Sequence, residues 1–172
     1  MTNSDEKSRC KPTDERETPQ WFYNVLDKAY HFTVDVAASA GNTKCGTFLL
    51  EGLQVAWRGH VWCNPPYSNV RPWIDKAWYD WERLGPSQLP LIVMLLPADT
   101  STHWFHEGIW RWRDEPGFTI TYLQGRMAFL PHTAGAKKGS MLCVWDRRKK
   151  AQAKHPVLPV TVSHPPVEVH AS

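Results

Sequence analysis

The sequence predicts a single α/β domain in which strand–helix units with parallel strands are followed by an antiparallel pair. Three observations lead to this fold class. Residues 89–97 are an unbroken apolar run, typical of a central parallel strand buried on both faces. Residues 60–63 are a shorter apolar run, and a strongly amphipathic helical pattern follows it at residues 70–84. Two late segments, 118–123 and 140–145, favour strands and predict the antiparallel pair.

Length and composition narrow the class of protein. The 172 residues are enough for one domain with a single core, and the net charge of +3 permits nucleic-acid binding without requiring it. The four cysteines are scattered, without metal-ligand spacing or a secretory signal nearby, which predicts reduced thiols in a cytoplasmic protein. No apolar run approaches the roughly 20 residues that a membrane-spanning helix needs.

The domain is expected to span residues 18–146. Residues 1–17 are polar and highly charged and predict a disordered N-terminal tail. Residues 147–172 begin with a basic run and become rich in proline, which predicts a second tail. The fold is therefore expected between these two tails.

The first helix is predicted to begin at Thr18, a favoured capping residue, with Pro19 in its first turn, and to end near Tyr30. Residues 32–38 are then predicted to form the first strand, and the small residues 39–42 after it would let a ligand approach the backbone closely.

Two acidic residues in or after this first strand are candidates for contact with a ligand. Asp35, within or at the end of the strand, is open to two interpretations, contact with a cofactor or satisfaction of local backbone groups. Glu51 could bond a ribose hydroxyl, but a solvated turn residue is the favoured interpretation.

In the second half, the tryptophan stripe of the helix at 70–84 predicts core packing rather than a base-stacking platform. A short helix is expected near residues 103–109, where His103 and His106 lack a third ligand, so no metal site is expected. The late strand at 118–123 is predicted to continue through residues 125–130.

The loop Asn64-Pro65-Pro66-Tyr67 lies between a strand and a helix, where open α/β sheets bind ligands. The side-chain amide of Asn64 and a backbone carbonyl can each accept one N–H of a planar amine, which aims its lone pair at an electrophile. The two prolines stiffen the backbone, and Tyr67 offers a ring face for stacking. The motif therefore predicts methyl transfer to an amine. A rigid turn without a catalytic role is the alternative.

These residues resemble the catalytic motif of amino-methyltransferases that use S-adenosylmethionine. Over residues 18–146 the chain resembles the phage-type DNA N6-adenine methyltransferases, a Dam-like family. The matching pieces occur in the family's order: Thr18-Pro19 with Phe22, residues 32–38 with Asn42, residues 62–68, Leu96-Pro97-Ala98 with Thr102, Trp104 and Phe105, and Gly125-Arg126 with Phe129.

The resemblance implies an abbreviated Rossmann-like class I methyltransferase sheet, S-adenosylmethionine as cofactor, and site-specific methylation of adenine N6 in double-stranded DNA. It also implies a flipped target base and a phage or prophage protein acting in the bacterial cytoplasm. The catalytic residues it implies are Asn64, Pro65, Pro66 and Tyr67. The cofactor-binding residues it implies are Thr18, Pro19, Phe22, Asp35, Ala37, Ala38 and Asn64.

Two departures from the wider superfamily keep alternatives open. Ala37-Ala38-Ser39 replaces the usual glycine-rich cofactor loop. Only 64 − 35 = 29 positions separate Asp35 from Asn64, too few for two full strand–helix units, so the sheet is expected to be abbreviated there. Amine methylation of RNA or of protein glutamine, and a non-catalytic DNA-binding module, are the competing functions.

The basic residues expected to contact DNA phosphates lie late in the chain. No separate target-recognition domain is expected, so the core would gain much of its DNA affinity from phosphate contacts. A solvated charge run is the alternative. The residues are Arg126, Lys137, Lys138, Arg147, Arg148, Lys149 and Lys150.

Overall fold

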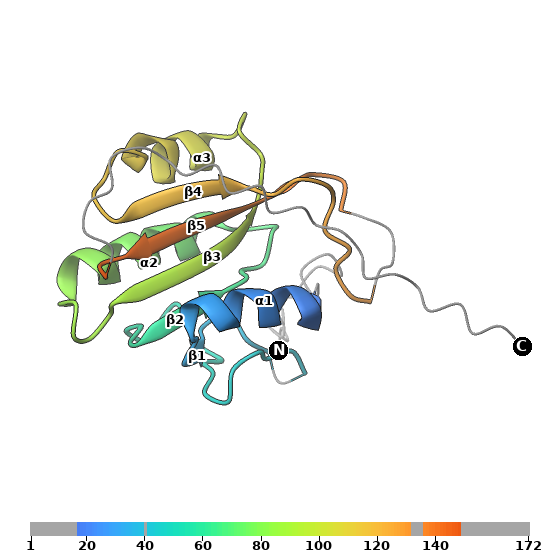
Figure 1. Ribbon diagram of the computed structural model, residues 1–172. Helices are drawn as coiled ribbons and strands as arrows, with labels where there is room; N and C mark the ends of the chain where they lie inside the picture. The colour runs from blue at the N-terminus through green and yellow to red at the C-terminus, as the bar shows by residue number, and fades with distance from the viewer. Residues whose placement is uncertain (1–16, 40, 132–135, 149–172) are drawn as a thin grey trace, which may run out of the picture.

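The computed structural model describes residues 17–39, 41–131 and 136–148. Both predicted tails therefore lie almost wholly outside the described residues. A five-stranded mixed sheet forms the centre, in the order β1-β2-β3-β5-β4 (Figure 1). The strands β1, β2 and β3 are parallel, and β5 is antiparallel to both β3 and β4. The parallel strands and the antiparallel pair of β4 with β5 confirm the prediction, whereas the pairing of β5 with β3 was not predicted. Their bounds are Val34–Asp35 (β1), His60–Cys63 (β2), Leu91–Pro97 (β3), Phe118–Tyr122 (β4) and Ser140–Asp146 (β5).

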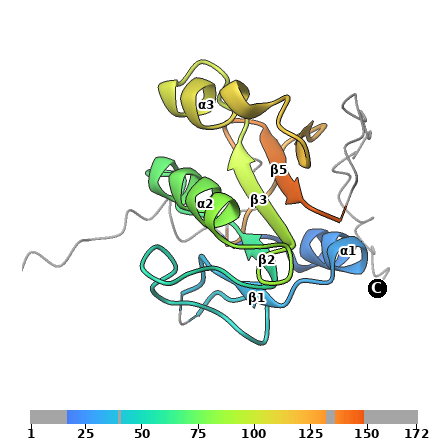
Figure 2. The ribbon, with the colours of Figure 1, turned by 90° about the vertical axis from the view of Figure 1, so that its left-hand side faces the viewer.

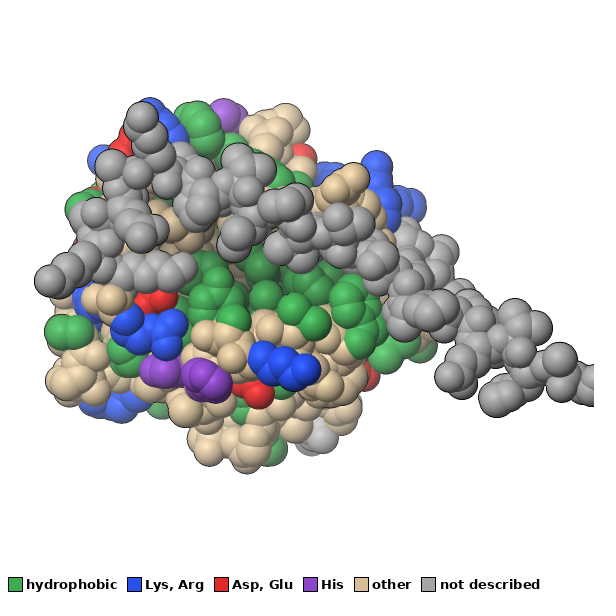
Figure 3. All heavy atoms as spheres, viewed as in Figure 1, with side chains coloured by type: hydrophobic (Ala, Val, Ile, Leu, Met, Phe, Trp, Pro, Cys, Tyr) green, Lys and Arg blue, Asp and Glu red, His purple; other side chains and the backbone are tan. Residues whose placement is uncertain are grey.

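The helices lie on both faces of this sheet. Helix α1 (Gln20–Tyr30) covers one face, whereas α2 (Arg71–Arg83) and α3 (His103–Gly108) lie on the other (Figure 2). A short 3-10 helix, η1 (Trp110–Trp112), follows α3. On the α1 side, apolar side chains gather at the centre of the surface, with histidine and basic side chains beside them (Figure 3).

Strand β3 is buried along its whole length, which confirms the prediction of a central strand. Its side chains alternate between two apolar cores. Ile92, Met94 and Leu96 face the core under α2, and Leu91, Val93 and Leu95 face the core under α1. Each fully buried aliphatic side chain contributes about 1.5–3 kcal/mol. The tryptophan stripe of α2 is also core, because Trp78 and Trp81 are buried there.

Strand β1 has two residues, far fewer than the predicted stretch 32–38. It lies next to only one strand, the four-residue β2, and the chain turns away directly after Asp35. Beyond β1 the sheet continues only as a bridge, in which Asp35 N–H donates to the Thr47 carbonyl at 3.1 Å and Leu49 N–H donates to the Asp35 carbonyl at 2.8 Å. The abbreviation expected between Asp35 and Asn64 is therefore observed.

Two local predictions were wrong. Residues 125–130 do not continue β4, which ends at Tyr122. The chain there passes through Gly125 at φ +90°, a conformation that favours glycine and breaks the ladder. Thr18 does not cap α1, whose N-cap residue is Pro19 without a side-chain bond. The hydroxyl of Thr18 instead accepts a hydrogen bond from the side chain of Asn64.

Candidate active site

The motif Asn64-Pro65-Pro66-Tyr67 begins where β2 ends. Cys63, the last residue of β2, pairs with Met94 of β3, so the motif lies at the carboxyl edge of the parallel strands. The Pro66 carbonyl accepts the Asn69 N–H at 3.1 Å, which closes a turn just before α2. Pro65 is buried and the other three motif residues are half-buried. The strand–loop–helix context expected of this motif is present.

The amide of Asn64 is held by Thr18. Its Nδ2 donates to the Thr18 hydroxyl at 3.0 Å, although the two residues are 46 positions apart. Thr18 is 1% exposed. Just before it, Glu17 exchanges two backbone hydrogen bonds of 3.0 Å with Leu130. The fold thus brings Thr18, one of the residues assigned to the cofactor by resemblance, into contact with the Asn64–Tyr67 motif.

Tyr67 packs against Phe129. The two rings meet edge to face with centroids 5.6 Å apart and an interplanar angle of 81°. Phe129 is buried, on the segment that links β4 to β5. Phe129 matches the family pattern, which was its one signal in the sequence, but it was not among the predicted site residues. The contact places a second aromatic ring beside the Asn64–Tyr67 loop.

Asp35 organises the loop that follows β1. Its Oδ1 accepts the Ala37 N–H at 3.2 Å, and its Oδ2 accepts the Lys44 N–H at 3.0 Å. Burial of the carboxyl raises its pKa from 3.8 to about 6, partly offset by those two backbone donors. These contacts match the local-backbone interpretation of Asp35. Ala37 and Ala38, both half-buried, follow it at the same edge.

The side chain of Lys44 joins this loop to the start of α1. Its ammonium lies 2.5 Å from Glu17 Oε1 and 3.3 Å from Gln20 Oε1, and the side chain is 3% exposed. Nothing in the sequence pattern signals this pair, because its members are 27 positions apart. The pair anchors the residue that precedes Thr18.

Two other residues assigned to the cofactor by resemblance, Pro19 and Phe22, are buried in helix α1 or at its start. Phe22 is 1% exposed and packs in the apolar core under α1 with Leu26 and Leu95. Pro19 is buried at the start of α1, where its carbonyl accepts the Phe22 N–H at 3.1 Å. Both residues therefore lie in the segment that carries Thr18 to the motif.

Three of the predicted DNA-contacting residues lie at the carboxyl edge. Arg126 donates to the carbonyls of Ala136 and Lys137, and Lys138 pairs with Asp99, two residues beyond β3. All three basic side chains belong to exposed residues. The segment that carries them thus lies at the same edge as Asn64.

Arg147 and Arg148 lie at the opposite edge, because β5 runs antiparallel to β3 and its last residue, Asp146, pairs with Leu91. The seven residues of β3 separate the two edges by about 20 Å. The guanidinium of Arg148 donates two hydrogen bonds to the Asp146 carboxylate, at 2.9 and 3.1 Å, and its backbone N–H donates a third at 3.0 Å. The structure therefore does not bring these arginines to Asn64, and Lys149 and Lys150 lie outside the described residues.

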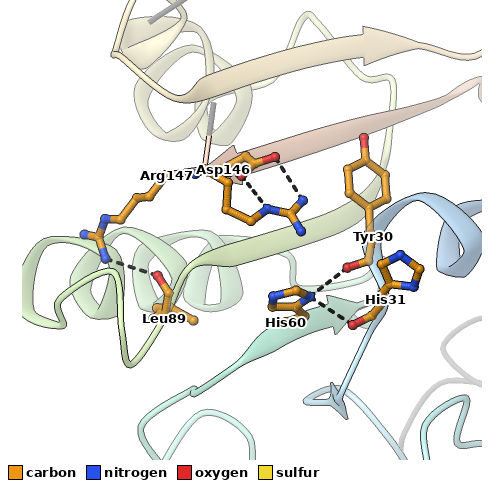
Figure 4. Close-up of polar contacts among 7 residues, drawn as sticks. Tyr30, His31, His60, Leu89, Asp146 and Arg147 are labelled. Carbon is orange, nitrogen blue, oxygen red and sulfur yellow. Dashed lines mark hydrogen bonds and ion pairs between the residues drawn. The ribbon is translucent and has the colours of Figure 1, made fainter. Parts of the chain in front are cut away.

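Arg147 is engaged inside the fold. Its guanidinium donates to the carbonyls of Leu84 at 2.6 Å and Leu89 at 3.1 Å, and also to that of Trp81 (Figure 4 shows the bond to Leu89). It also lies 3.9 Å from the centroid of the Trp81 ring. These contacts close the carboxyl end of α2.

Two features are absent from the residues that the structure describes. No helix there is long and apolar enough to cross a membrane. No three histidine, cysteine, aspartate or glutamate side chains in those residues come together as metal ligands would.

Comparison with known proteins identifies the family. The family profile described as "DNA N-6-adenine-methyltransferase (Dam)" matches residues 5–165. A relative called DNA N-6-adenine-methyltransferase, from Haemophilus phage HP1, is 34% identical over 113 residues, which are 61% of this chain and 61% of that protein. One of the same name from Escherichia phage T1 is 31% identical over 173 residues, covering 88% of this chain and 71% of that protein. The match thus spans less than two thirds of the HP1 protein.

Among solved structures, that of a candidate RNA methyltransferase, PH1948 from Pyrococcus horikoshii, aligns with a TM-score of 0.45 and 15% identity. The alignment covers 77% of this chain and 81% of that one, and at this score it adds nothing to the topology described above. The profile match over most of the sequence and the similarity to the T1 protein show that the chain belongs to the DNA N-6-adenine-methyltransferase (Dam) family.

Proposed function

We propose that this protein transfers a methyl group from S-adenosylmethionine to the N6 amine of adenine in double-stranded DNA. The observation that carries the proposal is the placement of Asn64-Pro65-Pro66-Tyr67 at the carboxyl edge of β2, with the amide of Asn64 held by Thr18. Family membership adds the substrate, because both phage relatives are named as DNA adenine enzymes.

The chemistry assigned to the motif is positioning of a weak nucleophile. The lone pair of an exocyclic amine is delocalised into its ring, so the nitrogen reacts poorly until that conjugation is weakened. The amide oxygen of Asn64 and the carbonyl of Pro65 each accept one N–H of the amine, and the lone pair then turns toward the methyl donor. The Pro65 carbonyl is assigned because that of Pro66 closes the turn with Asn69.

The cofactor is assigned to the carboxyl end of β1. S-adenosylmethionine supplies a methyl group activated by a positively charged sulfonium. The buried carboxylate of Asp35 fits a cationic neighbour, which would favour its charged form against the effect of burial. The small, half-buried Ala37 and Ala38 fit a ligand that approaches the backbone closely. Asp35 acts mainly through the loop it orders, since both its oxygens accept backbone N–H groups.

The target base must leave the duplex, since N6 of a paired adenine is hydrogen-bonded and stacked. We assign the ring of Tyr67 to stack on the extruded base. Its edge-to-face partner Phe129 fixes the ring and keeps an apolar wall beside it. DNA phosphates are assigned to Arg126, Lys137 and Lys138, which share this edge.

The test offers labelled methyl donor to duplex DNA, RNA and a protein mixture side by side, with Asn64→Ala as the inactive control. The proposal expects label in duplex DNA, recovered as N6-methyladenine, and none with the control. Label mainly in RNA or in protein glutamine would change the acceptor. No binding of S-adenosylmethionine up to millimolar concentration would instead favour a non-catalytic DNA-binding module.

A further inference from the structure

We propose that Thr18 is a positioning residue for catalysis: its hydroxyl holds the Asn64 amide with Oδ1 as the end that meets the acceptor amine. This inference rests on the proposed function, because it concerns the same methyl transfer. It gives Thr18 a role beyond the cofactor contact that the family resemblance implies.

The two ends of an asparagine amide have nearly the same shape and opposite hydrogen-bonding character. Oδ1 only accepts, and Nδ2 only donates. An adenine amine needs acceptors for its two N–H groups, so an amide rotated by 180° would set donor against donor. The amide must therefore keep one orientation during the reaction. In the structure Asn64 Nδ2 donates to the Thr18 hydroxyl at 3.0 Å, which is the orientation that methyl transfer requires.

The hydroxyl of Thr18 is itself fixed in place. The residue is 1% exposed, and Pro19, with φ −55°, follows it at the start of α1. On its other side, Glu17 is bonded to Leu130 through both backbone groups and to the buried ammonium of Lys44. This hydroxyl is therefore a fixed partner for the Asn64 side chain, and the hydrogen bond between them limits how far the amide can move from its place at the motif.

A helix cap would have been the ordinary use of a threonine at this position. The structure excludes that use, because α1 begins without a side-chain cap and its N-cap residue is Pro19. The Thr18 hydroxyl instead accepts a hydrogen bond from Asn64 Nδ2 at 3.0 Å. Thr18, a residue type that favours helix caps, therefore makes a contact with the motif 46 positions away instead.

The test compares Thr18→Val, which keeps the shape and removes the hydroxyl, with Thr18→Ser, which keeps the hydroxyl. Thr121→Val on the edge strand β4 makes the same chemical change away from the site. We expect kcat of Thr18→Val, at saturating cofactor and DNA, to fall roughly 10- to 100-fold, because the Asn64 amide loses the hydrogen bond that holds it in place. Thr18→Ser and Thr121→Val should stay within about threefold of the unaltered protein, and cofactor affinity should change by no more than about threefold in any variant.

Two kinetic outcomes would overturn the inference. Unchanged kcat in Thr18→Val would show that the amide needs no help from the hydroxyl. Weakened binding of S-adenosylmethionine, with kcat restored at saturation, would make Thr18 a cofactor-binding residue only.

A readout independent of activity separates this inference from the proposed function. In 15N-labelled protein, the side-chain amide resonances of Asn64, assigned through Asn64→Ala, should shift in Thr18→Val and return in Thr18→Ser. If the unaltered protein methylates no adenine, the proposed function fails, but these resonances still test the contact. Resonances that are the same in the unaltered protein and Thr18→Val would overturn the positioning role.

Discussion

Both edges of the sheet carry basic side chains, and they use them in opposite ways. At the carboxyl edge of the parallel strands, where the Asn64–Tyr67 loop lies, Lys137 and Arg126 are exposed, and Lys138 forms an ion pair with Asp99 at the surface. At the amino edge, Arg147 gives its guanidinium to carbonyls at the end of α2 and to the ring of Trp81. The first set can meet phosphates, whereas Arg147 completes the fold.

The difference shows that a basic run in a sequence does not reveal where its charge is used. The last carbonyls of a helix have no partners within it and attract cations. Arg147 donates hydrogen bonds to such carbonyls at the end of α2. Burial there disfavours the charged guanidinium and lowers its pKa. That Arg147 and Arg148 contact DNA stays a prediction, and our own proposal for phosphate contacts centres on the carboxyl edge, where Asn64 lies.

The strongest test of the contrast is Asn64→Ala at the carboxyl edge. Methylation should fall by at least roughly a thousandfold, because the substitution removes the acceptor that orients the amine. Affinity for S-adenosylmethionine should stay within about tenfold, equivalent to ~1.4 kcal/mol, because the amide acts mainly on the acceptor. Single-turnover kinetics and calorimetry give the two quantities. Turnover at the unaltered rate would refute the assigned mechanism.

The next effect concerns pH and Asp35. Because burial raises its pKa from 3.8 to about 6, the folded protein binds this proton more tightly than the unfolded chain. The resulting stabilisation is complete below about pH 4 and is lost as the pH rises through about 6. At 1.36 kcal/mol per unit, the loss amounts to as much as about 3 kcal/mol.

Asp35→Asn cannot titrate, so it isolates this contribution. Between about pH 4 and pH 7 the unfolding free energy of the unaltered protein should fall relative to that of the variant, because only the unaltered protein loses the contribution of protonated Asp35. Urea unfolding at several pH values measures it. Parallel pH profiles for the two proteins would show that Asp35 titrates normally in the folded state.

At the amino edge, Arg147→Met should lower stability by about 2 kcal/mol, because it leaves part-buried carbonyls of α2 without their charged donor. DNA affinity should not change. Arg58→Met is the matched control, since Arg58 is exposed just before β2 at the same edge and loses the same charge. Thermal unfolding and DNA titration together decide the matter: weaker DNA binding by the Arg147 variant alone, with normal stability, would reverse the assignment.

The smallest expected effect is on DNA binding by Lys137→Ala with Lys138→Ala. Two lost phosphate contacts should flatten the log–log salt slope by 2 × 0.9, about 1.8, and weaken cognate and random duplexes alike. Lys28→Ala with Arg58→Ala removes the same charge at the other edge and should leave the slope unchanged. If both double variants keep the salt slope of the unaltered protein, neither set of basic residues contacts the phosphates.

The elements that the sequence predicted well are those with a strong local pattern. Strand β3 and helix α2 were found within two residues of their predicted limits, because an apolar run and an i, i+3, i+4 stripe are set by neighbours in the chain. The position of the catalytic motif followed from these two elements. Local pattern failed at β1, whose length depends on how few partners an edge strand finds.

The contacts that complete the candidate site could not be predicted in this way. Thr18 with Asn64, Glu17 with Lys44, and Tyr67 with Phe129 each join residues brought together only by tertiary folding. The residue types gave misleading local signals, since Thr18 looked like a helix cap and residues 125–130 like a strand. The family resemblance pointed to Thr18 and Phe129, but it did not show that they contact Asn64 and Tyr67.

Hydrogen exchange of the protein, free and bound to duplex DNA with S-adenosylmethionine, tests the central claim most directly, because it reports on both edges at once. The account predicts slowed exchange at amides 67–71, in and after the Asn64–Tyr67 loop, and at amides 136–139, which include Lys137 and Lys138, with unchanged exchange at 84–89 and 147–148. Protection confined to the second pair of segments would contradict it, since DNA would then bind at the edge opposite Asn64.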